Sequence, residues 1–219
     1  MELLENLQGA LEKTYGLDAD HRVTDFLTTS RGLAASLGLS PGEAAAEEHL
    51  LVAEAEDGLD LAVFLAPEVL ARLADEDPLE HLHDGNLADF WTALEGVSHF
   101  LYLTWNAGRG KPVTLLELEL QAEVDKFVVT ALVAAAQHGR VPAELHQWLF
   151  RLCRVDDSLD AETRARYERA SRYAGHYCES LAHRYLRGRT SRALVPELRR
   201  FYRLTQRGKL SHIASRRLS

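Results

Sequence analysis

Cysteine is scarce in this chain, and its two cysteines, Cys153 and Cys178, stand far apart. They match no CxxC-type spacing, which excludes a disulfide framework, and we expect both thiols to be reduced packing residues. The apolar segment 127–136 is too short to span a bilayer. Residues 1–13 lack the basic start and the apolar core of a signal peptide. We therefore expect a cytoplasmic protein that makes no membrane contact.

Motifs for covalent catalysis and for nucleotide binding are also lacking. The loop 106–112 contains Gly-Arg-Gly-Lys, in which free backbone N–H groups and two cations can hold a phosphate. It lacks the P-loop spacing, and no Ser or Thr follows Lys111, so we interpret it as a turn between helices. No serine has evident histidine and acid partners, and neither cysteine lies in a nucleophile motif. Whether the protein is an enzyme stays open at this stage.

What the N-terminal part does contain is a β-hairpin pattern. Two apolar runs within residues 49–66 flank Asp57-Gly58, a pair suited to the positive φ angles of a tight type I′ turn. Pairing about that turn sets two pairs of apolar residues opposite each other, Val52 with Val63 and Leu50 with Leu65. The alternative interpretation continues a helix, expected for the Ala/Glu run that ends at Glu48, into this segment.

The most extensive apolar faces lie in two long helices, expected on either side of the loop 106–112 and together covering residues 86–136. At 100° per residue, Leu94, Val97 and Leu101 fall on one stripe of the first helix. Residues 127–136 of the second helix are apolar almost all round, so we expect neighbours on every side. Spacing and breaking residues predict further elements: helices over 2–15, 160–186 and 196–208, and a strand within 22–29.

These elements predict an α+β protein with a small N-terminal antiparallel sheet that contains a β-hairpin. A mainly helical body, built around the long helical hairpin, follows it. Three regions are expected: 1–85 with the sheet, 86–155 with the helical hairpin and a short helix, and the basic helical region 156–219. The alternative is one continuous domain.

Charge is divided unevenly along the chain. Residues 1–150 carry 8 basic and 26 acidic side chains, whereas residues 151–219 carry 17 basic and 7 acidic ones. The basic third can dock on an acidic surface, either of its own chain, of a second copy or of a partner protein, or it can bind a polyanion. Our leading interpretation is a non-catalytic interaction or regulatory protein that docks on an acidic partner or on a second copy of itself.

The second functional hypothesis is nucleic-acid binding by the basic C-terminal helices. On the helix expected over 160–186, cationic side chains share one band that an aromatic residue flanks, and such a stripe can track phosphates and stack a base. The residues of this predicted polyanion site are Arg169, Arg172, His176, His183 and Arg187. No helix-turn-helix, zinc-finger or RNA-recognition motif supports it.

The third hypothesis is a metal-dependent enzyme with a carboxylate and histidine site between helices. Glu95 and His99 share a face of the first central helix, and Glu119 and Glu123 share a face of the second, because each pair is four residues apart. If the faces converge, these ligands suit a divalent transition metal such as iron, manganese or zinc. The Glu-x-x-x-His spacing departs from the Glu-x-x-His of ferritin-like bundles. Alternatively, the four residues are structural, with Glu123 paired to Lys126.

Overall fold

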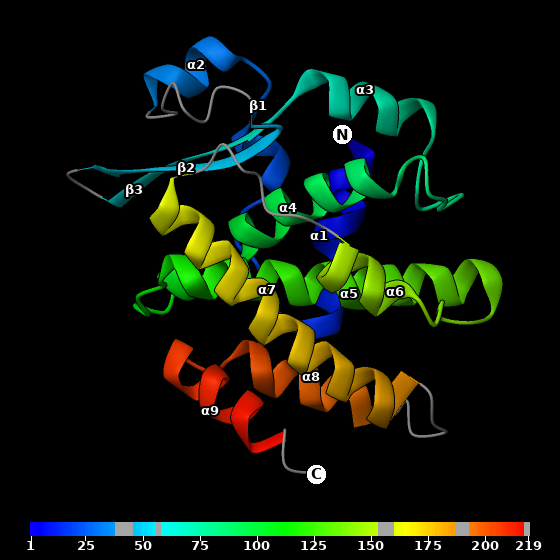
Figure 1. The fold of residues 1–219 in the computed structure, drawn as a ribbon. Coiled ribbons are helices and arrows are strands. Elements are labelled where there is room, and N and C mark those ends of the chain that lie inside the picture. Colours follow the sequence, from blue (N-terminus) through cyan, green and yellow to red (C-terminus); the bar gives the residue numbers. More distant parts are fainter. Residues whose placement is uncertain (38–45, 56–57, 153–159, 187–192, 217–219) are drawn as a thin grey trace.

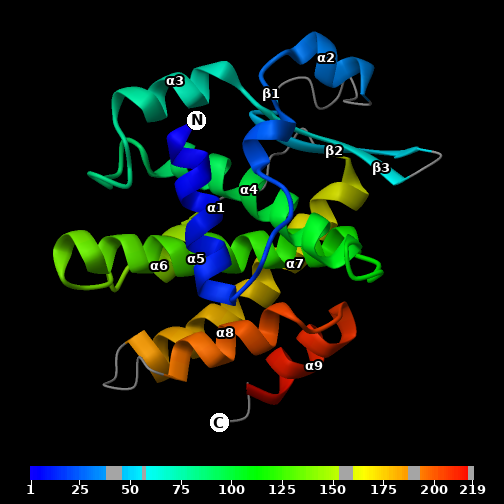
Figure 2. The ribbon, with the colours of Figure 1, turned by 180° about the vertical axis from the view of Figure 1, so that it is seen from behind.

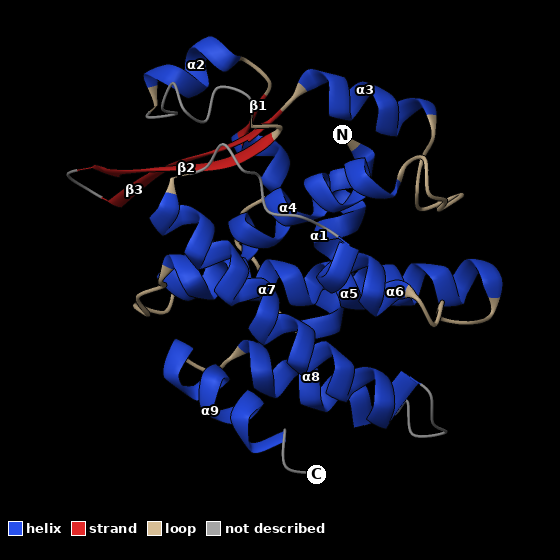
Figure 3. Ribbon diagram, viewed as in Figure 1, coloured by secondary structure: helices blue, strands red, loops and turns tan. Residues whose placement is uncertain are grey.

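The computed structural model describes residues 1–37, 46–55, 58–152, 160–186 and 193–216 of the chain. It confirms the α+β class, because a small sheet lies against a larger helical body (Figures 1 and 3). Cys178 is a free, buried thiol, as expected, whereas Cys153 lies outside the described residues. None of the helices in the described segments is both long and apolar enough to cross a membrane.

The sheet is mixed rather than antiparallel, which corrects the prediction. Its order is β1 (Leu27–Thr28), β3 (Gly58–Leu65) and β2 (Glu48–Ala55). β2 and β3 form the predicted antiparallel hairpin, but β1 pairs with β3 in parallel. The parallel pairing arises because the chain passes through α2 (Arg31–Ser36) and β2 before it returns as β3. Only two residues of the expected strand within 22–29 pair, since a 3-10 turn occupies Val23–Phe26.

The hairpin register differs from the predicted one by two residues. Leu50 pairs with Val63, and Val52 pairs with Leu61. The cause is the place of the turn: Ala55 pairs with Gly58, so the glycine belongs to β3 rather than to the turn. Residues 56–57, which include Asp57 of the predicted turn, lie outside the described residues. A shift of two residues keeps each side chain on its face of the sheet, so the hydrophobic pattern is compatible with both registers.

The two central helices are present as predicted, α4 (Leu87–Ala107) and α5 (Leu115–His138). A capping box starts α5: the Thr114 side chain accepts from the Glu117 N–H at 3.2 Å, and the Glu117 carboxylate accepts from the Thr114 N–H. Such reciprocal bonds satisfy N–H groups that a helix start leaves unpaired. Shorter helices flank this pair, α1 (Glu2–Tyr15), α3 (Pro67–Asp75) and α6 (Leu145–Gln147), the last extended by a π-helical turn over Trp148–Leu152.

The C-terminal region also begins as predicted, with α7 (Ala161–Leu181) and a π-helical continuation over Ala182–Leu186. The prediction of a single final helix over 196–208 is wrong. Two helices occur in this region, α8 (Leu194–Tyr202) and α9 (Gln206–Arg216). Thr205 starts the second one, since its hydroxyl accepts from the Gly208 N–H and its carbonyl accepts from the Lys209 N–H. Threonine favours such a cap over a helix interior.

The elements stack in layers around α5 (Figure 1). The sheet with α2 and α3 lies above α4, α7 crosses α5, and α8 and α9 lie at the opposite end from the sheet. From behind, α1 runs along the body and contacts α4, α5 and α8 (Figure 2). One core cluster includes residues from the sheet, the central helices and the C-terminal helices, among them Phe64, Phe100, Phe127, Tyr177 and Phe201.

Candidate metal centre

The four residues predicted as metal ligands come together between α4 and α5. Nε2 of His99 lies 3.5 Å from a carboxylate oxygen of Glu119. Nζ of Lys126 lies 2.9 Å from Glu95 and 2.5 Å from Glu123, and so joins the other two carboxylates. Residues four apart share a helix face, and α4 and α5 turn these faces towards each other. Metal binding by the four residues stays a prediction.

A fifth residue, Glu48, enters the same cluster from the start of β2. Its Oε1 lies 3.5 Å from Nδ1 of His99, on the side of the ring opposite Glu119. Ligand atoms of Glu48, Glu95 and His99 all lie within 4.8 Å of one another. The sequence analysis missed Glu48 because it assigned the residue to a helix, whereas Glu48 is the first residue of β2.

Gly96 brings the sheet close enough for Glu48 to reach His99. A Cβ atom at this position would lie 3.1 Å from Cγ of Glu48 and 3.2 Å from Cγ1 of Val63. Such distances are shorter than ordinary van der Waals contacts, so the missing side chain is what allows this close packing of α4 against β2 and β3. The glycine therefore positions the strand residue relative to the helix residues.

The cluster is largely withdrawn from water. The side chains of His99 and Glu119 are 7% exposed and that of Glu48 is 10% exposed. Burying carboxylates in this way requires compensating charge. Lys126 supplies part of it, and Arg166 of α7 supplies more, with its Nε 3.7 Å from Oε1 of Glu119. The centre thus contains residues from β2, α4, α5 and α7.

Burial and charge shift the pKa values of these groups in opposite directions. Burial raises the pKa of Glu48, and the neighbouring His99 opposes the rise only in part. Burial works against ionisation of Glu95, but the charges of Lys126 and His99 outweigh it and lower the pKa of that carboxyl. Burial likewise disfavours the His99 imidazolium, yet the carboxylates of Glu119 and Glu48 on either side of the ring hold the pKa of His99 well above its usual value. The cluster therefore favours positive charge at the position of His99.

Two polar atoms of the cluster form ion pairs but, among the described residues, no well-aligned hydrogen bond. Oε1 of Glu48 and Nε2 of His99 are buried, and neither makes a hydrogen bond of acceptable geometry. Both atoms take part in ion pairs at 3.5 Å, which is long for a hydrogen bond. An ion held by Glu48 and Nδ1 of His99 would satisfy the carboxylate oxygen and leave the Nε2 proton for Glu119. The donor set of carboxylates and an imidazole is the set that iron, manganese and zinc accept.

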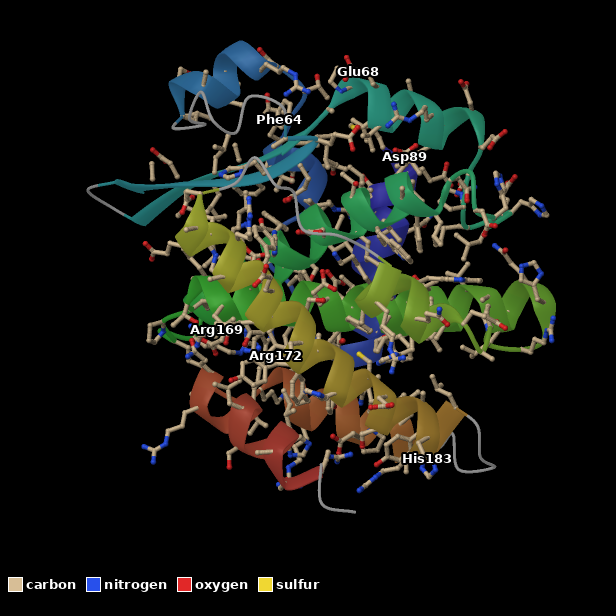
Figure 4. All side chains as sticks on the ribbon, in the orientation of Figure 1. Phe64, Glu68, Asp89, Arg169, Arg172 and His183 are labelled. Atoms are coloured by element: carbon tan, nitrogen blue, oxygen red, sulfur yellow. The ribbon has the colours of Figure 1, made fainter. Side chains whose placement is uncertain are left out.

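The predicted polyanion site is only partly assembled. Arg169 and Arg172 are exposed and close together on α7, while His183 is exposed near the far end of the helix (Figure 4). His176 is half-buried, and Arg187 lies outside the described residues. The binding of nucleic acid by this face stays a prediction.

Part of the basic C-terminal region contacts the chain's own N-terminal and central elements. Arg199 donates to the carbonyls of Lys13 and Thr14, and Arg203 donates to those of Tyr15 and Gly16. These carbonyls end α1, where a helix leaves acceptors unpaired and where its dipole favours cations. The contacts favour internal docking as one use of the positive charge.

No protein-family model, curated protein or solved structure matches the chain. Because a fold alone does not specify a function, the function has to be argued from the chemistry of the site.

Proposed function

We propose that the protein binds one divalent transition-metal ion through Glu48, Glu95 and His99. The observation that carries the proposal is the convergence of their ligand atoms within 4.8 Å of one another. Ligand atoms around one metal ion are separated by about 3 to 4 Å, given bonds of about 2.0–2.2 Å. Small side-chain rotations therefore suffice to close the three groups around an ion.

The surrounding residues support this assignment. Nδ1 of His99 is on the Glu48 side of the ring, and Nε2 is on the Glu119 side. A metal-bound histidine usually donates its second N–H to a carboxylate, which fixes the ring and increases its basicity. Glu119 is placed for that role, and Arg166 in turn lies beside Glu119. The charged pair of Lys126 and Glu123 stands next to Glu95.

The number of ligands favours a catalytic centre over a structural one. Structural zinc sites are closed by four protein ligands, whereas catalytic sites use three and leave a position for water or substrate. A metal in such a site supplies a Lewis acid or an activated water. The third functional hypothesis, a metal-dependent enzyme, is therefore the one that this geometry supports best.

Calorimetric titration of the metal-free full-length chain with MnCl2 and with ZnCl2 tests the proposal. We expect one ion per chain for at least one of the two metals. Glu48→Gln and Glu95→Gln each keep the size of the side chain but remove its charge, and we expect a loss of about ten- to one-hundred-fold in affinity. Glu144→Gln, at an exposed carboxylate, serves as the matched control and should bind as the wild type does.

Absence of binding to the folded wild type with both metals contradicts the proposal. Wild-type affinity in both Glu48→Gln and Glu95→Gln contradicts it as well, because the ion then lies elsewhere. Circular dichroism spectra of each variant show whether the fold is retained.

A further inference from the structure

A cavity of about 440 Å³ lies between the loop that follows α1 and the C-terminal end of α4. Figure 2 shows that loop passing from the end of α1 towards the sheet, on the side of the molecule away from α7. The cavity shares no lining residue with the candidate metal centre. Its volume is within the range of small-molecule sites, at the lower end.

Part of the wall is apolar and aromatic. Phe26, Leu61 and Trp105 line the cavity, and Phe26 also packs against Phe100 of the core, with ring centroids 5.1 Å apart. The Trp105 side chain is 6% exposed, and its Nε1–H is a buried donor that finds no acceptor in the described part of the chain. Because that nitrogen is fully buried, it is not open to the cavity, and Trp105 lines the cavity through its other atoms.

Charges of both signs also line the cavity. Asp18 and Asp20 come from the loop after α1, and Arg109 follows the end of α4. The guanidinium of Arg109 is fixed in place, because its Cζ lies 4.0 Å from the Trp105 ring centroid and its Nη1 donates to the Trp105 carbonyl at 3.0 Å. Among the described residues, neither aspartate makes an ion pair with Arg109 or with another cation.

We propose that this cavity binds a small zwitterion with an aromatic body, the class to which aromatic amino acids belong. The ammonium group is placed at Asp18 and Asp20, the ring packs on Phe26 and Leu61, and the carboxylate is placed at Arg109. The two signs of charge line one cavity without pairing, so a ligand that carries both neutralises both ends at once.

The same charges disfavour three related classes of ligand: simple cations, simple anions and neutral aromatic molecules. A simple organic cation leaves Arg109 unpaired and repels it, and a simple anion faces two aspartates. A neutral aromatic molecule fills the apolar wall but forms no ion pair with any of the three exposed charges. Each of these ligands therefore loses interactions that the zwitterion makes.

Calorimetric titration of the full-length chain with three related probes tests the proposal. The probes are phenylalanine, phenethylamine, which lacks the carboxylate, and 3-phenylpropionate, which lacks the ammonium group. We expect phenylalanine to bind at one molecule per chain and each analogue to bind at least about ten-fold more weakly. Arg109→Gln should weaken phenylalanine about ten-fold, whereas Arg140→Gln, at an exposed arginine elsewhere, should leave it unchanged.

Three outcomes overturn the proposal. The first is no binding of phenylalanine at concentrations up to about 10 mM, which is weaker than recognition by paired charges requires. The second is equal affinity for all three probes, which shows an apolar cavity without charge recognition. The third is unchanged binding of phenylalanine in Arg109→Gln. Arg109 is exposed but contacts the ring and the carbonyl of Trp105. Circular dichroism of Arg109→Gln therefore checks that the fold is retained, and metal binding succeeds or fails independently.

Discussion

Lys209 is the most unusual single residue outside the two proposed sites, because its amine is completely buried. Nζ donates to Oε1 of Gln121 at 2.5 Å and lies 4.3 Å from the ring centroid of Tyr102. Burial lowers the pKa of Lys209 to about 7, although the charge of Asp125 opposes the shift. Burial raises the pKa of Asp125 to about 6, against hydrogen bonds from Ser98, Tyr15 and Gln121. α9 therefore docks through an amine that is largely neutral above neutral pH.

This pKa predicts how stability depends on pH. In the unfolded chain Lys209 holds its proton up to about pH 10.5, whereas in the folded chain it loses the proton near pH 7. Between these values the unfolded state binds more protons, so the free energy of unfolding of the wild type falls as the pH falls from 10.5 to 7. Lys209→Met removes that dependence. The stability of the variant relative to the wild type should therefore rise by a few kcal/mol from pH 10 to pH 7.

Urea denaturation of both proteins at pH 7, 8.5 and 10 measures the difference. Titrating groups that do not interact with Lys209 cancel in the comparison, whereas Asp125 and Glu117 do interact with it. Parallel profiles for the wild type and Lys209→Met would show that the amine keeps an ordinary pKa in the folded state.

For the candidate metal centre, the sequence predicted the residues that lie on helices but not the one that lies on a strand. Glu95 with His99, and Glu119 with Glu123, follow from the helical repeat, which fixes a shared face without any tertiary information. Glu48 joins them only through the packing of β2 on α4, which depends on contacts between distant segments. The charged residues around the 440 Å³ cavity were not predicted as a site for the same reason, since Asp18 and Arg109 line one cavity only in the folded chain.

Among the elements, the packing of α4 on the sheet decides where Glu48 lies. Gly96→Ala inserts a methyl group 3.1 Å from Cγ of Glu48 and 3.2 Å from Cγ1 of Val63, so these side chains must shift by a few tenths of an ångström. We expect metal affinity to fall about ten-fold although Gly96 is no ligand, because a small displacement separates Glu48 from Glu95 and His99. Calorimetric titration with the metal bound by the wild type gives the measurement.

The matched control is Gly9→Ala in α1, where an added Cβ meets no atom within 4 Å. It tests the same chemical change in a helix without the close approach, and alanine there should stabilise the helix slightly. If Gly96→Ala binds the metal as tightly as Gly9→Ala does, the close packing is not what positions the ligand.

The types of the main elements were predictable from local sequence pattern. The register of the hairpin and the break between α8 and α9 were not. Hydrophobic periodicity identified α4, α5, α7 and the hairpin, because apolar residues recur along each of them at the spacing of a helix or of a strand. The register depended on whether Gly58 belonged to the turn or to β3, and both choices keep the apolar face. The break between α8 and α9 depends on the cap formed by Thr205, a residue that helices also tolerate in their interior.

On the scale of the whole molecule, hydrogen bonds join the basic C-terminal region to the end of the N-terminal helix α1. Arg203 donates to the carbonyls of Tyr15 and Gly16, both at 3.0 Å. Arg203→Gln should lower the free energy of unfolding by about 1–2 kcal/mol, because the carbonyls lose charged donors. It should also raise amide exchange at the end of α1. Chemical denaturation and hydrogen exchange report the two effects.

Arg200→Gln serves as the control, because Arg200 is an exposed arginine of α8, three residues before Arg203. Equal stability of the two variants would show that Arg203 contributes no more than a solvated surface charge. The charge division was visible in the sequence, but its internal partners were not, because backbone carbonyls at a helix end carry no sequence signal.

The central claim is that Glu48, Glu95 and His99 hold a metal ion, and native mass spectrometry of the purified chain tests it most directly. After incubation with Mn²⁺, Fe²⁺ or Zn²⁺ and removal of excess metal, the account predicts one added ion per wild-type chain. It predicts the bare mass for Glu95→Gln. A folded wild-type chain that keeps its bare mass with all three metals contradicts the account.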